Sequence, residues 1–248
     1  SILPGKTPFS KEDFENAIIM TDAIASAIKP LYSFLAYAEK SELSKDGIIA
    51  TKYQTDMLPA KLPVIDKLQI GCFSNPVENV CGDYYDVLVS RKDRVSFVMA
   101  DVAGKGMNSL VVMIMIRAIL RLSVNTAQSA STILSWANRG ICLESSKIDH
   151  FASVALMIYD SINNKVQYAS GGTNPIFLYT KESDVVKEIS KIQEPVGVEK
   201  TTEYADNDIS VNSGDIIITC TDGLIEALNG DGHQYGKKNH EKVVKAYH

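Results

Sequence analysis

From Leu68 onward the chain consists largely of short apolar runs of strand length, and this pattern constrains the fold more than any other feature. The runs are bounded by Gly, Pro, Asn and Asp, as strands usually are. The predicted strands cover residues 68–73, 84–89, 95–99, 153–159, 166–169, 176–179 and 216–220. Asn163 and Asn164 between two of them predict a hairpin turn, because Asn tolerates positive φ.

Helical patterns interrupt these strands. Residues 107 to about 124 and 129 to about 143 have apolar residues at helical spacing, and further helices are expected to begin near Leu224 and Asn239. Strands grouped together with long helices between the groups favour α+β layering over regular alternation of strand and helix. We therefore predict an α+β fold.

The region before the strands has a helical pattern. Apolar residues recur at helical spacing from Phe14 to Leu35, where Pro30 is expected to kink or split the helix. A second helix is predicted from 48 to about 57, and the prolines at 59 and 63 end it. The sequence thus predicts an N-terminal helical extension.

Charge and hydropathy exclude two classes of partner. The formal net charge of −5 argues against nucleic acid as the main partner. The longest apolar run, residues 110–116, is too short to span a bilayer. We expect no contact with nucleic acid or membrane.

The four cysteines, Cys72, Cys81, Cys142 and Cys220, are scattered and form no Cys-x-x-Cys pair. We interpret them as buried, reduced thiols, which places the protein in a reducing compartment such as the cytoplasm.

Three aspartates lie where predicted strands begin or end: Asp83, Asp101 and Asp222. Strand ends are where chains turn and where sites are built. Carboxylates brought together from distant segments repel one another unless a cation joins them, and Mg²⁺ and Mn²⁺ prefer such oxygen ligands. The pattern indicates a metal-dependent hydrolase.

Each of these residues also has a simpler structural interpretation. Asp83 follows a glycine and is compatible with an ordinary turn. Asp222 is compatible with the N-cap of the helix that follows it, whereas a hairpin at Asp222–Gly223 is disfavoured by the helix formers after it. Lys105 stands in a glycine-containing loop that lacks P-loop spacing, so we interpret it as a loop lysine.

Two further features attract attention without a firm assignment. The segment 171–175, Gly-Gly-Thr-Asn-Pro, connects two predicted strands and is interpreted as a plain tight turn. His150 matches no metal or triad spacing and receives no role, although it directly precedes a strand and could approach a site.

Taken together, these segments resemble the metal-dependent protein phosphatases (PPM), in the bacterial branch typified by SpoIIE and RsbU. The resemblance covers roughly residues 58–236. Single motifs are weakly specific, but their order and spacing are highly specific. The motifs that carry the resemblance are Leu-Pro at 58–59, Gly-Asp-Tyr-Tyr-Asp at 82–86, Ala-Asp-Val-Ala-Gly-Lys-Gly at 100–106, Phe-Ala-Ser at 151–153, the segment 171–175, Ser-Gly-Asp at 213–215 and Thr-Asp-Gly-Leu-Ile-Glu-Ala at 221–227.

The resemblance implies a four-layer α-β-β-α sandwich of two antiparallel sheets, with two Mn²⁺ or Mg²⁺ ions at one edge. By analogy, Asp101 would bridge both ions, the carbonyl of Val102 would bind one and Asp222 the other. Asp83 would act directly or through bound water. A water activated by the two metals would be the nucleophile.

The implied function is hydrolysis of phosphoserine or phosphothreonine on a regulatory partner, a phosphorylated protein of the anti-anti-sigma type. An upstream sensor domain would regulate the activity, and the helical lead-in is compatible with a homodimer. The alternative is a catalytically silent, phosphatase-like signalling module that binds a partner.

The resemblance also divides the chain. Residues 1–40 would be the C-terminal end of a GAF-like sensor domain, 41–66 a helical linker and 67–248 the phosphatase domain. Such domains close with an Asp-rich segment and a last strand that are not found here, so we expect the domain to lack its C-terminal segment.

Overall fold

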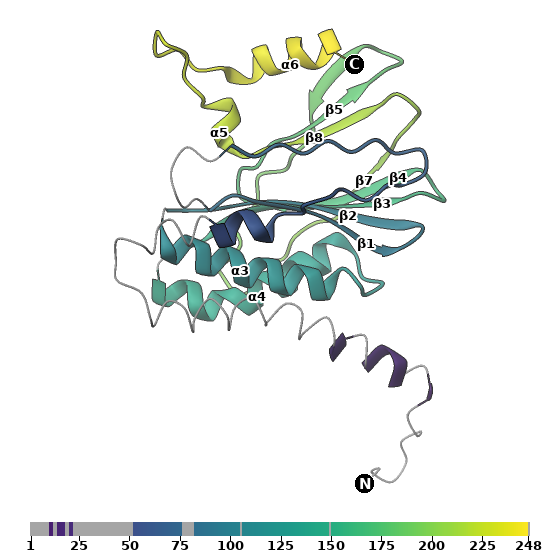
Figure 1. The fold of residues 1–248 in the computed structure, drawn as a ribbon, viewed down its shortest axis with the longest axis vertical. Coiled ribbons are helices and arrows are strands. Elements are labelled where there is room, and N and C mark those ends of the chain that lie inside the picture. Colours follow the sequence, from purple (N-terminus) through teal and green to yellow (C-terminus); the bar gives the residue numbers. More distant parts are fainter. Residues whose placement is uncertain are drawn as a thin grey trace.

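The computed structural model is shown in Figure 1. It describes residues 10–11, 14–17, 20–21, 52–75, 82–104, 106–148 and 150–247. Most of the expected sensor segment 1–40 and residues 41–51 of the expected linker lie outside these residues, as do Pro30, Cys81 and Lys105. The division of the chain into domains therefore stays a prediction.

One sheet has five antiparallel strands in the order β1-β2-β3-β4-β7. Their bounds are Tyr84–Arg91 (β1), Arg94–Val102 (β2), Ala152–Asp160 (β3), Lys165–Gly171 (β4) and Asn207–Ser210 (β7). Four of these strands are joined to their neighbours in chain order, and α3 and α4 are inserted between β2 and β3.

The second sheet has three antiparallel strands in the order β6-β5-β8. Their bounds are Val185–Glu188 (β6), Ile176–Thr180 (β5) and Ile216–Thr219 (β8). The long helices α3 (Met107–Ser123) and α4 (Ala130–Ile148) cover the outer face of the five-stranded sheet. The short α5 (Asp222–Ile225) and α6 (Gly236–Tyr247) lie on the side of the three-stranded sheet (Figure 1). The predicted α+β sandwich of two antiparallel sheets is confirmed.

The strands of the five-stranded sheet have two buried faces, as their alternation requires. In β2, Val98, Ala100 and Val102 belong to the core under α3 and α4. Phe97 and Met99 pack instead with residues of the second sheet such as Ile176. Because side chains alternate along a strand, Asp101 follows Met99 onto the face between the sheets.

Most long apolar strands and both long helices were predicted within a few residues. Asn164 has a φ of 49°, which confirms the predicted hairpin turn. The helix α4 extends to Ile148, five residues beyond the predicted end at 143, and α6 begins at Gly236 rather than at Asn239.

The predicted strand at 68–73 is wrong. Leu68 makes only an isolated bridge with Ile65, and the following residues form no ladder. The side chain of Phe73 is 86% exposed, so this apolar run is not part of a buried strand. The strands β6 and β7 were missed because only four residues pair in each and their mostly exposed side chains give no apolar run.

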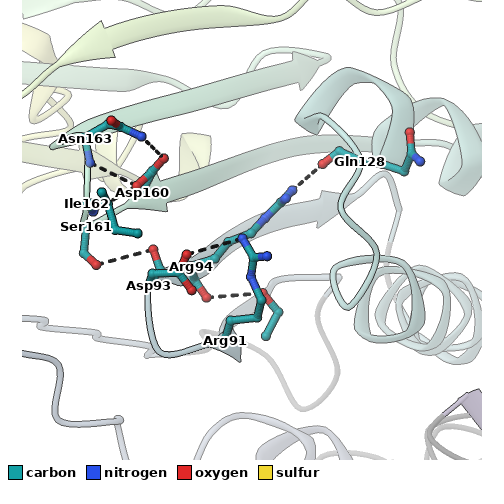
Figure 2. A network of polar contacts seen from close by, with 9 residues as sticks. Arg91, Asp93, Arg94, Gln128, Asp160, Ser161, Ile162 and Asn163 are labelled. Carbon is teal, nitrogen blue, oxygen red and sulfur yellow. Dashed lines mark hydrogen bonds and ion pairs between the residues drawn. The ribbon is translucent and has the colours of Figure 1, made fainter. Parts of the chain in front are cut away.

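A polar network ties together the hairpins at one end of the five-stranded sheet (Figure 2). Arg91 pairs with Asp93 at 3.4 Å, and the backbone N–H of Ser161 donates to the carbonyl of Asp93. Arg94 donates to the carbonyl of Gln128 in the connection between α3 and α4. Arg94 begins β2, so this network lies roughly 23 Å along the strand from Asp101 at about 3.3 Å per residue.

A buried carboxylate joins β1 to α3. The side chain of Asp86 is 1% exposed and accepts hydrogen bonds from the hydroxyl of Tyr84 and from Nε of Arg121, the latter at 2.7 Å. Burial raises the pKa of Tyr84, and the nearby charge of Asp86 raises it further. The pair fixes α3 against the strand that begins just after Asp83.

We expect Arg121→Met to lower the free energy of unfolding by about 1.5–3 kcal/mol, because it leaves the buried Asp86 without its charged donor. Denaturant unfolding followed by circular dichroism measures the change. The matched control is Arg91→Met, which breaks a pair whose arginine side chain is 62% exposed, and it should cost less than about 1 kcal/mol. Equal losses in the two variants would contradict the role given to Asp86.

Candidate metal centre

Asp83 and Asp101 are brought together by the pairing of β1 with β2. Tyr84 lies opposite Ala100, and the backbone N–H of Val102 donates to the carbonyl of Gly82 at 3.3 Å. The same register continued by one residue places Asp83 opposite Asp101. Like charges directly opposite each other on two strands destabilise the pair, so this juxtaposition has a cost.

Gly82 allows the two strand ends to approach so closely. A Cβ atom added at this position would lie 2.3 Å from the carbonyl oxygen of Val102 and 2.9 Å from its Cβ atom. Any side chain at residue 82 would therefore push the segment away from β2, and Asp83 would move with it.

Asp222 arrives from the other sheet. It is the first residue of α5 and lies three residues after the end of β8, and Thr221 occupies the N-cap position. The hydroxyl of Thr221 makes no capping hydrogen bond within the helix; it donates to Oδ2 of Asp83 at 3.2 Å. Asp222 is thus neither the N-cap nor part of a hairpin turn, which settles the two alternatives for this residue.

The three carboxyl groups interact directly. Burial raises the pKa of Asp101 to about 7, and the charges of Asp83 and Asp222 and hydrogen bonds to both of these residues add to the shift. Burial also raises the pKa of Asp83, an effect opposed by hydrogen bonds from Thr221 and with Asp101 and reinforced by the charge of Asp222. All three sequence-predicted aspartates therefore lie in one cluster.

The donor set of this cluster suits a hard divalent cation. Carboxylate oxygens are the ligands that Mg²⁺ and Mn²⁺ prefer, and a cation relieves the repulsion that raises the pKa of Asp101. Among the residues that the structure describes, however, no three His, Cys, Asp or Glu side chains stand in an arrangement that could hold a metal ion. Rotation of side chains would therefore be needed for the three carboxyl groups to enclose a common centre.

The loop that follows Asp101 rests on the start of β3. The backbone N–H of Ala103 donates to the carbonyl of Phe151 at 2.8 Å. Gly104 has a φ of 89°, and a Cβ atom there would lie 2.8 Å from Nε2 of His150. His150 therefore does approach the loop beside the cluster, although no role for it follows from this contact alone.

Sequence reasoning missed Asn174. The segment 171–175 was interpreted as a tight turn, but it carries the chain from β4 in one sheet to β5 in the other. The side chain of Asn174 is buried, and its amide donates to the carbonyls of Met99 and Ser153. The sequence signal was an Asn before Pro, which also fits an ordinary turn.

The prediction that all the cysteines are buried is wrong for Cys72, which is exposed because its segment is not a strand. Cys142 and Cys220 are buried. Burial, with the charges of Asp222 and Glu188, raises the pKa of Cys220 to about 11. A thiol with so high a pKa is a poor nucleophile at neutral pH.

None of the helices in the described parts of the chain is both long and apolar enough to cross a membrane. The expected cytoplasmic location stays a prediction.

Comparison with known proteins identifies the family. The sequence profile described as "Stage II sporulation protein E (SpoIIE)" matches residues 91–248, which is more than half of the chain. The chain belongs to the SpoIIE family. The matched region of this SpoIIE-family chain includes Asp101, Asp222 and the segment 171–175, whereas Asp83 precedes it.

The SpoIIE-family chain is similar to three further proteins. It is 26% identical to "Phosphoserine phosphatase RsbU" of Bacillus subtilis (strain 168) over 193 residues, which cover 78% of this chain and 57% of RsbU. Its fold is similar to the "SiaA-PP2C domain of Pseudomonas aeruginosa", with a TM-score of 0.67, 17% identity and coverage of 82% and 81%. It is also similar to RsbX, solved in complex with magnesium, with a TM-score of 0.51, 16% identity and coverage of 67% and 80%.

The compared proteins differ from this chain in length and in sequence. The chain spans little more than half the length of RsbU. The solved structures are less than 25% identical to it, so they show the fold, which is that of PP2C domains.

We expect Gly82→Ala to destabilise the protein by about 1–3 kcal/mol, because the added methyl group meets the backbone of Val102. Thermal or denaturant unfolding measures this loss. Gly71→Ala is the matched control, since a Cβ atom there meets nothing within 4 Å. A substitution at Gly82 that is as harmless as that at Gly71 would refute the close approach.

We expect Asp101→Asn to stabilise the metal-free protein at pH 8. The pKa of Asp101 is raised from its ordinary value of 3.8 to about 7, so the stability associated with the protonated group is present below pH 4 and lost as the pH rises through 7. The midpoint of thermal unfolding in EDTA should rise by about 2–4 °C for each kcal/mol of repulsion removed. The gain should shrink as the pH is lowered from 8 to 5; a gain that does not depend on pH would contradict the assigned cause.

Proposed function

We propose that this chain is a metal-dependent serine/threonine protein phosphatase. The observation that carries the proposal is the convergence of Asp83, Asp101 and Asp222, the first two of them partly buried, into one mutually repelling cluster. Membership of the SpoIIE family and the similarity to a protein named phosphoserine phosphatase support it.

In this proposal, the three aspartates and the carbonyl of Val102 hold two Mn²⁺ or Mg²⁺ ions. Asp101 interacts with both of the other carboxyl groups, which suits a residue shared by both ions. When bound, such ions lower the pKa of water and neutralise charge on phosphoryl oxygens. The magnesium in the similar RsbX structure supports this choice of cation.

The chain's own residues prepare this site. Thr221 restrains the carboxyl of Asp83 through its hydroxyl, and Gly82 sets the distance between Asp83 and β2. Because the pKa of Asp101 is about 7, this carboxyl holds a proton part of the time at neutral pH. The proton must leave when a cation binds, so binding strengthens as the pH rises.

A water nucleophile is also favoured by the state of the nearby thiol. Cys220 is two residues from Asp222, yet it is buried and its pKa is raised to about 11. A covalent route through a thiolate would require the opposite environment, with a lowered pKa and an accessible sulfur.

The substrate in this proposal is phosphoserine or phosphothreonine on a partner protein of the anti-anti-sigma type. The name of RsbU, phosphoserine phosphatase, supports the phosphoserine part of this substrate. Regulation by an upstream sensor domain and assembly as a homodimer belong to the same proposal.

The test is Mn²⁺-dependent hydrolysis of a phosphoserine protein, measured as release of inorganic phosphate. Asp101→Asn should lower the rate by more than the roughly 10- to 100-fold that loss of an outer-shell partner costs. Asp93→Asn is the matched control, because Asp93 lies in the hairpin network far from the cluster, and its rate should equal that of the wild type. Equal rates in wild type and Asp101→Asn would refute the proposal.

The silent-module alternative has one observation in its favour: in the described part of the chain no three candidate ligands are already arranged around a common centre. It predicts no hydrolysis by the wild type with either Mn²⁺ or Mg²⁺. The same assay therefore separates the two functions.

A further inference from the structure

We propose that Asn174 is a positioning residue that sets the distance between the two halves of the aspartate cluster. The inference rests on the proposed function, since it assigns a role in metal binding. It starts from the segment 171–175, in which the chain leaves the five-stranded sheet and enters the three-stranded one.

The amide of Asn174 holds the two central strands beside Asp101. Nδ2 donates to the carbonyl of Met99 in β2 at 3.3 Å and to that of Ser153 in β3 at 3.1 Å. Met99 is two residues before Asp101, and Ser153 is the cross-strand partner of Asp101. Asn174 is only 4% exposed, so water cannot easily replace these hydrogen bonds.

The two residues before Asn174 also lie against Ser153. The backbone N–H of Thr173 donates to Oγ of Ser153 at 3.1 Å. Gly172 has a φ of 87°, and a Cβ atom there would lie 2.3 Å from the same Oγ atom. The segment is therefore pressed against Ser153 and has little freedom to shift along β3.

The residue after Asn174 connects to the other half of the cluster. The hydroxyl of Thr219 in β8 donates to the carbonyl of Pro175 at 3.1 Å. Thr219 is three residues before Asp222. Asn174 and Pro175 are adjacent residues. One peptide unit therefore connects the Asn174 amide, which is bonded to β2 and β3, with the Pro175 carbonyl, which is bonded to β8.

A direct link between the two halves also exists at the cluster itself, from Thr221 to Asp83. That link involves one of the carboxyl groups, so it must adjust when the carboxyl turns toward a cation. The link through Asn174 and Pro175 uses backbone carbonyls and no carboxyl group. It can hold the strand ends in place while the carboxyl groups rotate.

The experiment compares Mn²⁺ binding to the full 248-residue chain and its variants by isothermal titration calorimetry, alongside the phosphate-release assay. Asn174→Ala should weaken Mn²⁺ binding by about 10- to 100-fold, the usual effect of losing an outer-shell partner. Hydrolysis should recover partly at saturating Mn²⁺, because the ligands themselves are intact.

Asn138→Ala is the matched control. Asn138 is a fully buried asparagine that donates to the carbonyl of Glu199 and accepts from the N–H of Gly197, each at 2.8 Å. None of these groups belongs to the strand ends that carry the aspartates. This variant should lower the unfolding midpoint while its Mn²⁺ affinity remains that of the wild type.

A folded Asn174→Ala protein with wild-type Mn²⁺ affinity would overturn the inference, as would an equal loss of affinity in Asn138→Ala. If Asn174→Ala does not fold, Thr219→Val decides, since it keeps the side-chain shape and removes only the hydroxyl bonded to Pro175. Unchanged affinity in that variant also overturns the inference, and a loss of about tenfold or more supports it.

Failure of the proposed function is distinguishable from failure of this inference. A wild type that binds Mn²⁺ without hydrolysing phosphoserine would refute the phosphatase, and the variants would still test the role of Asn174. A wild type that binds no Mn²⁺ would refute both.

Discussion

Repulsion among three neighbouring carboxyl groups, two of them partly buried, is the interaction on which the rest of the site depends. Asp83 and Asp101 face each other across two strands, and Asp222 approaches from the second sheet. Burial and mutual charge raise the pKa of Asp101 to about 7, so the folded chain bears an electrostatic cost at neutral pH. Such a cost persists only where the surrounding structure enforces the arrangement, and this is common where function needs it.

Uncharged features of the surrounding structure hold the three aspartates in this arrangement. The ladder between β1 and β2 fixes which residues face each other, and Gly82 lets the strand ends touch. Two apolar cores, one under the helices and one between the sheets, hold β2 on both faces. The buried amide of Asn174 spans β2 and β3 where Asp101 lies. Side-chain rotation is therefore cheap, whereas separation of the strands is not.

Sequence patterns predicted the elements whose own residues pack into a core. The strands around residues 95–99 and 153–159 are apolar because both faces are buried, and the helix α3 is apolar because it covers a sheet. The same logic failed at 68–73, where an apolar run has no partner strand, and at β6 and β7, where pairing occurs without burial. An apolar pattern indicates which residues of an element are buried. It gives little indication of strand pairing, because backbone hydrogen bonds between strands do not require apolar side chains.

The sequence by itself determined the α+β class, the main strands and helices, and the identities of the three aspartates at strand ends. Only the tertiary structure decided that these aspartates meet, that Thr221 rather than Asp222 occupies the N-cap, and that the segment 171–175 joins two sheets. The physical reason is that local pattern encodes which face of an element is buried. It does not encode which distant element lies against that face, because that choice depends on the packing of the whole chain.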